Sequence, residues 1–143
     1  MAGAGDIAKA MTQIEFFRNF ALEEVEQLLR MGSWLKVASG TTIIAEGEND
    51  LYLYVLIRGQ ANVIKNSRVL AGLGAGDVFG EISALAKTPR TAHVIAQSEV
   101  LCVRFEPGQI ERLPADLQLK LVKKILFTLA DRLTALNRKF CVT

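Results

Sequence analysis

The chain has 143 residues, of which 50% are hydrophobic, 22% charged and 7% aromatic, and its 17 basic and 15 acidic side chains leave a net charge of +2. Such a length predicts one domain, residues 1–143, and allows roughly 68% of the unfolded surface to be buried without disulfides or metals. The composition excludes intrinsic disorder. The single histidine, His93, and the distant Cys102 and Cys141 exclude a zinc cluster.

The distribution of apolar residues predicts neither a membrane span nor a signal peptide. No stretch approaches the roughly 18 consecutive apolar residues of a membrane span. Residues 1–10 contain no basic region followed by an apolar run, so they do not form a signal peptide. We therefore expect a cytoplasmic protein that has no membrane partner and whose two cysteines are reduced thiols with a packing role.

The near-neutral charge conceals an asymmetry. Residues 117–143 contain six basic side chains against one acidic side chain, whereas residues 1–116 contain 11 basic against 14 acidic side chains. A basic C-terminal segment is compatible with a nucleic-acid or membrane-surface patch. We favour the solvated face of an amphipathic helix, which needs no partner.

The first part of the chain, residues 1–33, has the periodicity of helices. Apolar residues recur every three or four positions at Ile7, Met11, Ile14 and Phe17, and again at Leu22, Val25, Leu28 and Leu29. This spacing predicts N-terminal helices that end at Gly32.

The middle of the chain, residues 34–106, changes to short β-rich runs separated by glycines. The runs are residues 35–38, 41–45, 51–57, 61–65, 69–73 and 93–105. Regularly spaced short strands with turn signals predict an antiparallel sandwich or barrel rather than alternating β-α units.

The last part, residues 107–143, is predicted to be helical. A short piece over 109–113 precedes a long helix from Asp116, a plausible N-cap, to Phe140. The long helix has an apolar seam with alternating spacings of three and four residues, at Leu119, Val122, Leu126, Leu129, Leu133, Leu136 and Phe140. We favour a parallel helix pair with a second copy of the chain over purely internal packing. Leu121 and Ile125 widen the apolar face, so both surfaces can be used at once.

Residues 76–92 contain the candidate ligand-binding groups. Gly80 lets backbone amides approach a ligand, and a short helix opening near Glu81 would present the N–H groups of Ile82 and Ser83 to an anion. Arg90 can bind two phosphate oxygens, and Thr91 offers a hydroxyl to the same group. We expect the Glu81 carboxylate to accept from a sugar hydroxyl while the neighbouring Arg90 holds it. This combination predicts a sugar-phosphate ligand.

These residues resemble the phosphate-binding cassette of the cyclic nucleotide-binding domain, a family that includes regulatory subunits of cyclic-AMP-dependent kinase, cyclic-nucleotide-gated channels and catabolite-activator-type regulators. The matching residues are Phe79, Gly80, Glu81, Ile82 and Ser83, followed by Pro89, Arg90, Thr91 and Ala92. Upstream, residues 46–48, 53–57 and Gly59 resemble the strand and turn signature of the family, so the resemblance covers nearly the whole chain.

The resemblance implies an α+β fold with an antiparallel β-roll (a double-stranded β-helix, jelly-roll-like), N-terminal helices and a long C-terminal helix. It implies that cyclic AMP or cyclic GMP is the ligand, that Glu81 binds the ribose 2′-hydroxyl and that Arg90 binds the cyclic phosphate. The other residues implied to complete the phosphate cradle are Gly80, Ile82, Ser83, Thr91 and Ala92. Thr91 leaves the choice of base open, because it occurs in domains that accept either nucleotide.

In this family a C-terminal helix closes over the base, which implies the same role for the long helix here. The candidate base contacts on the helix are Arg132, Leu133, Leu136 and Asn137, and those on the strands are Val63 and Leu70. The implied function is that of a regulatory sensor rather than an enzyme, with an unknown effector. We expect no DNA binding, because only three residues follow the long helix.

Four other interpretations were weighed. Glu81 and Arg90 could form only a structural ion pair. A dinucleotide loop at residues 72–77 is excluded because Asp77 replaces the third glycine. A cupin-type metalloenzyme lacks histidine ligands. The main alternative from another class is a dimerising interaction module that does not depend on a ligand.

Overall fold

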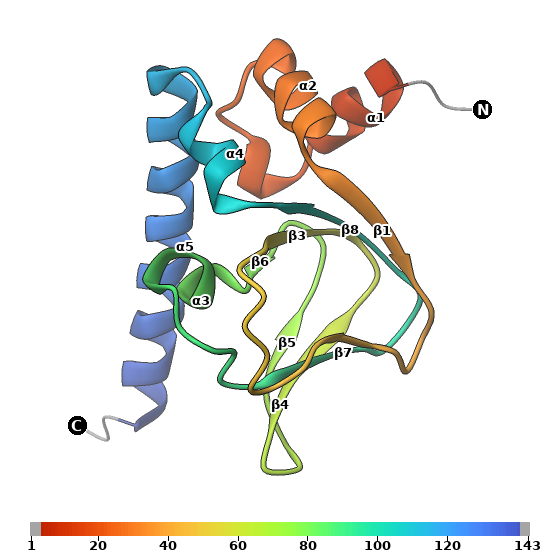
Figure 1. Cartoon of the computed structure of the whole chain (residues 1–143), viewed down its shortest axis with the longest axis vertical. Coiled ribbons are helices and arrows are strands. Elements are labelled where there is room, and N and C mark those ends of the chain that lie inside the picture. Colours follow the sequence, from red (N-terminus) through yellow and green to blue (C-terminus); the bar gives the residue numbers. More distant parts are fainter. Residues whose placement is uncertain (1–3, 141–143) are drawn as a thin grey trace.

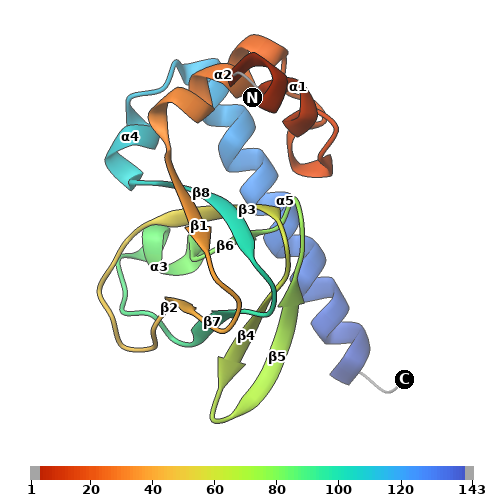
Figure 2. The same ribbon diagram turned by 90° about the vertical axis from the view of Figure 1, so that its right-hand side faces the viewer.

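The computed structural model describes residues 4–140 and contains a β-roll flanked by helices from both ends of the chain. Figure 1 shows helices α1, α2 and α4 gathered at one end of the molecule, while α5 runs along the side of the roll. The β4–β5 hairpin and the C-terminal end of α5 both lie at the opposite end, as the turned view in Figure 2 also shows. Cys141 and the side chains of Ile7, Lys139 and Phe140 lie outside the described part.

The N-terminal helices are present but are more interrupted than the periodicity predicts. They are α1 (Ala4–Met11), the 3₁₀ helix η1 (Glu15–Phe17) and α2 (Leu22–Met31). The interruption lets Phe16, Phe17 and Phe20 pack together, with 4.9 Å between the ring centroids of Phe16 and Phe17. Gly32 ends α2, as predicted, and a Cβ there would lie 2.5 Å from Val103, so the chain passes directly against the sheet.

The described residues form eight strands of the roll, and every predicted run overlaps at least one strand. They are β1 (Ser33–Val37), β2 (Thr42–Ile44), β3 (Leu53–Arg58), β4 (Ala61–Lys65), β5 (Arg68–Leu73), β6 (Val78–Phe79), β7 (His93–Ala96) and β8 (Val100–Phe105). The predicted run 93–105 divides into β7 and β8, which belong to different sheets, and the short β6 was not predicted. The sheets are antiparallel, with orders β1-β8-β3-β6 and β2-β7-β4-β5.

The first sheet is covered on both faces, which explains the continuous apolar run in β3. Leu53 and Val55 face the helices, whereas Tyr54 and Leu56 face the interior of the roll. Because successive side chains of a strand alternate between faces, a strand buried on both sides needs apolar residues throughout. Cys102 also lies in the roll interior as a free thiol, and burial raises the pKa of this thiol to about 11, so its role there is packing.

Within the described residues, two helices follow the roll, α4 (Pro107–Glu111) and α5 (Ala115–Phe140). The prediction that Asp116 caps α5 is wrong, because the helix begins one residue earlier and Asp116 lies in its first turn. There a carboxylate still interacts favourably with the helix dipole.

The two apolar faces of α5 have different surroundings. Leu117, Leu121 and Ile125 are buried against the N-terminal helices and the first sheet. The seam residues Leu119, Val122, Leu126, Leu133 and Leu136 are 42–59% exposed. Among the seam side chains that the structure describes, only Leu129 packs partly against the core. Most of the seam is therefore free of internal packing.

We predict that Leu121→Ala lowers the free energy of unfolding by about 2–4 kcal/mol, because the removed side chain is 1% exposed and leaves a cavity under α5. Leu119→Ala on the exposed face of the same helix should change it by less than about 0.5 kcal/mol. Urea denaturation at low protein concentration measures both. Equal losses would contradict this assignment of the two faces.

Candidate functional site

A cavity of about 390 Å³ opens between the second sheet, the turn from β6 into the short helix α3 (Glu81–Ala86), and α5. All seven predicted ligand-binding residues line it. The complete lining is Ile44, Val63, Ala71, Gly72, Leu73, Asp77, Phe79, Gly80, Glu81, Ile82, Ser83, Arg90, Thr91, Ala92, Val94 and Arg132. Segments that are far apart in the sequence thus share one largely apolar cavity whose lining also includes charged side chains.

The turn into α3 depends on Gly80. Its φ of 76° is in the left-handed region that favours glycine. A Cβ at this position would lie 2.8 Å from Nη1 of Arg90 and 3.0 Å from the carbonyl oxygen of Tyr52. The first hydrogen bond within the turn runs from the Ala84 N–H to the Gly80 oxygen, 3.1 Å, so the N–H groups of residues 81–83 precede the helical ladder, where an anion can be bound.

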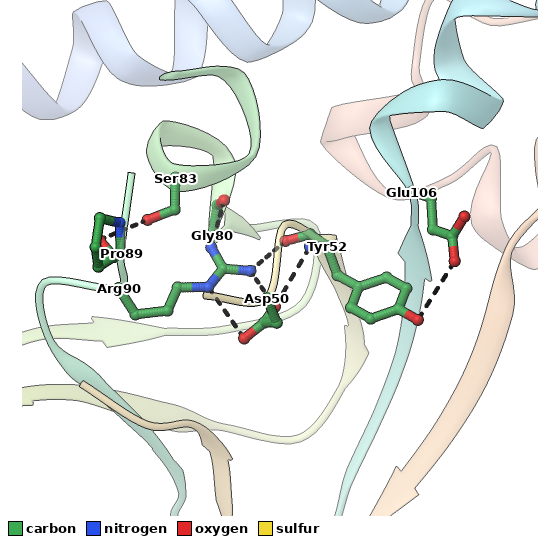
Figure 3. A network of polar contacts seen from close by, with 7 residues as sticks. All are labelled: Asp50, Tyr52, Gly80, Ser83, Pro89, Arg90 and Glu106. Carbon is green, nitrogen blue, oxygen red and sulfur yellow. Dashed lines mark hydrogen bonds and ion pairs between the residues drawn. The ribbon is translucent and has the colours of Figure 1, made fainter. Parts of the chain in front are cut away.

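Arg90 is 3% exposed and is held by three partners (Figure 3). Its Nε donates to Oδ2 of Asp50 at 3.2 Å, and its Nη2 donates to Oδ1 of Asp50 at 2.5 Å. Nη1 donates to the Gly80 oxygen at 2.7 Å, and Nη2 also donates to the Tyr52 oxygen at 2.6 Å. Asp50 and Tyr52 are not predicted from the sequence, because they are 40 and 38 residues away from Arg90 and their position carries no local signal.

Glu81 is paired with α5 and not with Arg90. Nη1 of Arg132 donates to Oε1 of Glu81 at 2.8 Å, and Nη2 of Arg132 donates to the carbonyl oxygen of Val78. The expectation that Arg90 holds Glu81 is therefore wrong, as is the alternative of a structural Glu81–Arg90 pair. The reason is that Asp50 already occupies the Arg90 guanidinium.

The electrostatics of Glu81 reflect its burial. Glu81 is 4% exposed, and this burial raises the pKa of its carboxyl above the ordinary value. Its own backbone N–H and the positive charges of Arg132 and Arg90 act in the opposite direction. A buried carboxylate with one oxygen on an arginine has its second oxygen available as an acceptor for a hydroxyl.

The predicted base contacts divide into two groups. Val63 and Arg132 line the cavity. Leu70, Leu133, Leu136 and Asn137 are exposed and are not among the lining residues, so their contact with a base remains a prediction.

The remaining polar groups support the cassette or lie outside it. Ser83 is buried and its hydroxyl donates to the Pro89 oxygen at 3.4 Å. His93 accepts the Glu46 N–H on Nδ1 at 3.1 Å. Within residues 4–140, no three His, Cys, Asp or Glu side chains are grouped so that they could hold a metal ion. Nor does any helix described here have the length and apolar character needed to cross a bilayer.

Comparison with known proteins defines the class of this chain. The sequence model of the family described as "Cyclic nucleotide-binding domain" matches residues 34–116, more than half of the chain. The protein therefore belongs to the cyclic nucleotide-binding domain family, and the family and the fold expected from the resemblance are confirmed.

Two curated relatives indicate the range of proteins that contain such a domain. The chain is 33% identical over 93 residues to cGMP-dependent protein kinase, isozyme 1, of Drosophila melanogaster, an alignment that spans 65% of this chain and 12% of the kinase. It is 28% identical over 116 residues to the Pycsar effector protein XpPycTIR of Xanthomonas perforans, spanning 80% of this chain and 38% of the relative. The chain thus matches only a minor part of these longer proteins.

Two solved structures show the same architecture. A cyclic nucleotide-binding domain from Methylobacillus flagellatus superimposes with a TM-score of 0.82 at 25% identity, covering 98% of this chain and 85% of that chain. The catabolite activator protein of Thermus thermophilus superimposes with a TM-score of 0.75 at 25% identity, covering 87% of this chain and 60% of that chain.

We predict that Gly80→Ala lowers the free energy of unfolding by about 1–2 kcal/mol, because a left-handed φ disfavours any side chain and the added Cβ meets the Arg90 guanidinium. The matched control is Gly74→Ala, where a Cβ would have no atom within 4 Å. Thermal melts of the two variants measure the difference. A Gly80→Ala protein as stable as the control would show that the turn tolerates a side chain.

Proposed function

We propose that this protein is a regulatory sensor that binds cyclic AMP or cyclic GMP in the cavity between the roll and α5. The observation that carries the proposal is the placement of a buried arginine and a buried carboxylate, Arg90 and Glu81, on one apolar cavity. A cyclic nucleotide has a negative phosphate, a free ribose hydroxyl and a flat base. The phosphate requires a positive charge such as Arg90, the hydroxyl requires an acceptor such as Glu81, and the base requires an apolar surface.

In this proposal each part of the nucleotide has its own residues. Arg90 binds the phosphate, and Glu81 accepts a hydrogen bond from the ribose 2′-hydroxyl. Completing the phosphate cradle are Gly80, Ile82, Ser83, Thr91 and Ala92, and the base is packed by Val63, Leu70, Arg132, Leu133, Leu136 and Asn137. The ligand is a regulatory signal and not a catalytic cofactor, and no catalytic residue or metal is assigned.

The ion pair between Glu81 and Arg132 couples the ligand to α5. Glu81 lies on the cavity wall, whereas Arg132 belongs to the helix, so a ribose that binds Glu81 acts on the residue that fastens α5 at this point. A ligand changes a conformational equilibrium only through contacts that differ between the two states. In this proposal the contact between Glu81 and the ribose exists only in the bound state, and Glu81 also contacts Arg132 of the helix.

The exposed seam of α5 supports pairing of two copies of the chain. Five seam residues remain 42–59% exposed after α5 has packed on its own domain, namely Leu119, Val122, Leu126, Leu133 and Leu136. A heptad seam is the pattern of a two-helix contact. We propose a homodimer through α5 whose stability depends on occupancy of the cavity, acting in the cytoplasm on an effector that is unknown. A dimerising module that ignores the ligand is the second candidate, which the same seam would serve.

Titration calorimetry with cyclic AMP and with cyclic GMP tests the binding claim. We expect heat from at least one nucleotide at micromolar protein.

Arg90→Ala should weaken binding by about 2–5 kcal/mol, because a charge-assisted contact with the phosphate is lost. Arg58→Ala, which removes an exposed arginine at the end of β3, is the matched control. Absence of heat from both nucleotides with folded protein would refute the proposal.

Light scattering with and without the nucleotide that binds tests the coupling to dimerisation. Leu126→Lys places a charge in the seam and should give a monomer, whereas Thr134→Lys, on an exposed position of α5 outside the seam, should behave as the wild type. We expect the wild-type dimer to tighten when nucleotide is added. A dimer that is indifferent to nucleotide would favour the second candidate.

A further inference from the structure

The single histidine of the sequence, His93, lies directly after the cassette as the first residue of β7. Its Nδ1 accepts a hydrogen bond from the backbone N–H of Glu46 at 3.1 Å. A neutral imidazole has one nitrogen that accepts and one that carries a proton, so this bond places the proton on Nε2. Glu46 begins the turn of residues 46–48, which follows β2, the strand that pairs with β7.

The turn of residues 46–48 is attached to the cassette at a second place. The Gly47 N–H donates to the carbonyl oxygen of Arg90, and the Arg90 N–H donates to the carbonyl oxygen of Glu48, both at 2.8 Å. The segment of residues 90–93 is therefore held against the turn at both ends, by backbone bonds at one end and by the imidazole at the other. Because this segment contains three residues of the proposed phosphate cradle, the turn fixes the backbone of the cradle.

Protonation of His93 removes the acceptor in this contact. Both nitrogens of an imidazolium are donors, so Nδ1 would then face the backbone N–H of Glu46 with a proton of its own. Histidines ordinarily gain this charge at about pH 6.5. The hydrogen bond is then lost, and one end of the segment of residues 90–93 is released from the turn.

The charged groups on the segments packed against the imidazole are exposed or already paired. Glu46 forms an ion pair with Lys65 of β4, the other strand that pairs with β7, with 3.8 Å between Oε1 and Nζ. Arg90 is paired with Asp50. Glu48 is exposed, so solvent screens its charge. A buried ion pair that would offset the lost hydrogen bond is therefore not formed by these groups.

We propose that His93 makes nucleotide binding dependent on pH, because it holds the turn of residues 46–48 on the cassette only when it is neutral. This inference rests on the proposed function. With the hydrogen bond made, the backbone of the cradle is ordered before the ligand arrives. Without it, part of the binding free energy is used to order the segment, so the affinity decreases. The sensor thus needs a higher nucleotide concentration in an acidic medium.

Titration calorimetry with cyclic AMP and cyclic GMP at pH 7.5 and pH 5.5 tests the effect on affinity. The wild type should bind about two- to tenfold more weakly at the lower pH, as expected for the loss of one hydrogen bond. His93→Asn places an amide oxygen near the position of Nδ1 and does not titrate, so it should keep most of the affinity at both pH values. His93→Ala has no acceptor and should bind more weakly at both.

The comparison between variants is needed because Glu81 also takes up protons as the pH falls. Burial raises the pKa of its carboxyl, and this residue is present in all three proteins. The measure is therefore the difference between the pH profiles of the wild type and His93→Asn. Far-UV circular dichroism checks that each protein is folded at both pH values.

Nuclear magnetic resonance of the ligand-free, untagged protein tests the hydrogen bond without any nucleotide. Because the sequence has one histidine, the imidazole signals belong to His93 alone. We expect the proton on Nε2 at pH 7.5, and a Glu46 amide signal that shifts together with protonation of the imidazole. A proton on Nδ1 at pH 7.5 would overturn the inference.

The possible outcomes separate this inference from the proposed function. If the wild type binds neither nucleotide at pH 7.5, the proposed function fails and this inference fails with it. If the wild type binds and His93→Asn loses the same affinity at pH 5.5, the pH dependence arises elsewhere and the role of His93 is overturned. Equal or tighter binding by the wild type at pH 5.5 would also overturn it. Should His93→Asn not fold, His93→Gln is measured in its place with the same expectations.

Discussion

The architecture of the site depends on one constraint, the burial of the positive charge of Arg90. An arginine that is 3% exposed cannot be left unpaired, because a buried and uncompensated charge costs several kcal/mol. The charge of Arg90 is paired with the carboxylate of Asp50, and its guanidinium donates to the carbonyl oxygens of Tyr52 and Gly80. Gly80 contributes by having no side chain, which lets its carbonyl and the guanidinium approach each other.

The two buried ion pairs connect three separate segments of the chain. Arg90 joins the cassette to the entry of β3, and Arg132 joins the cassette to α5 through Glu81. Both arginines and Glu81 line the same cavity, so one ligand can act on both pairs. Membership of the cyclic nucleotide-binding domain family gives this arrangement its functional context. In the function that we propose, these two ion pairs are the physical link between the ligand and the helix.

Helix α5 has two apolar stripes, one buried and one exposed. The residues that fasten it to the domain, such as Leu121 and Ile125, alternate along the helix with the exposed seam residues, such as Leu126 and Leu133. A helix with 3.6 residues per turn can present both stripes only if they occupy adjacent faces. Leu129, which packs partly against the core, lies on the border between them.

The sequence by itself determined the class of fold, the order of the elements and the cassette, because these depend on local periodicity and on residues within a short stretch. Helical spacing before Gly32, short β-rich runs after it and the Gly80–Ala92 segment are all local signals, and the strands and the cavity lining agree with them. Short elements such as β6, with two residues, carry too little pattern to be predicted.

Only the tertiary structure decided which charges are paired. Glu81 and Arg90 are close in the sequence. In the fold, however, Arg90 forms an ion pair with Asp50 and Glu81 forms one with Arg132, over separations of 40 and 51 residues. Ion pairing depends on distance in space and on competition for a buried donor, and neither can be derived from spacing along the chain. The same holds for α5, whose heptad seam is visible in the sequence, whereas the choice of the inward face required the packed domain.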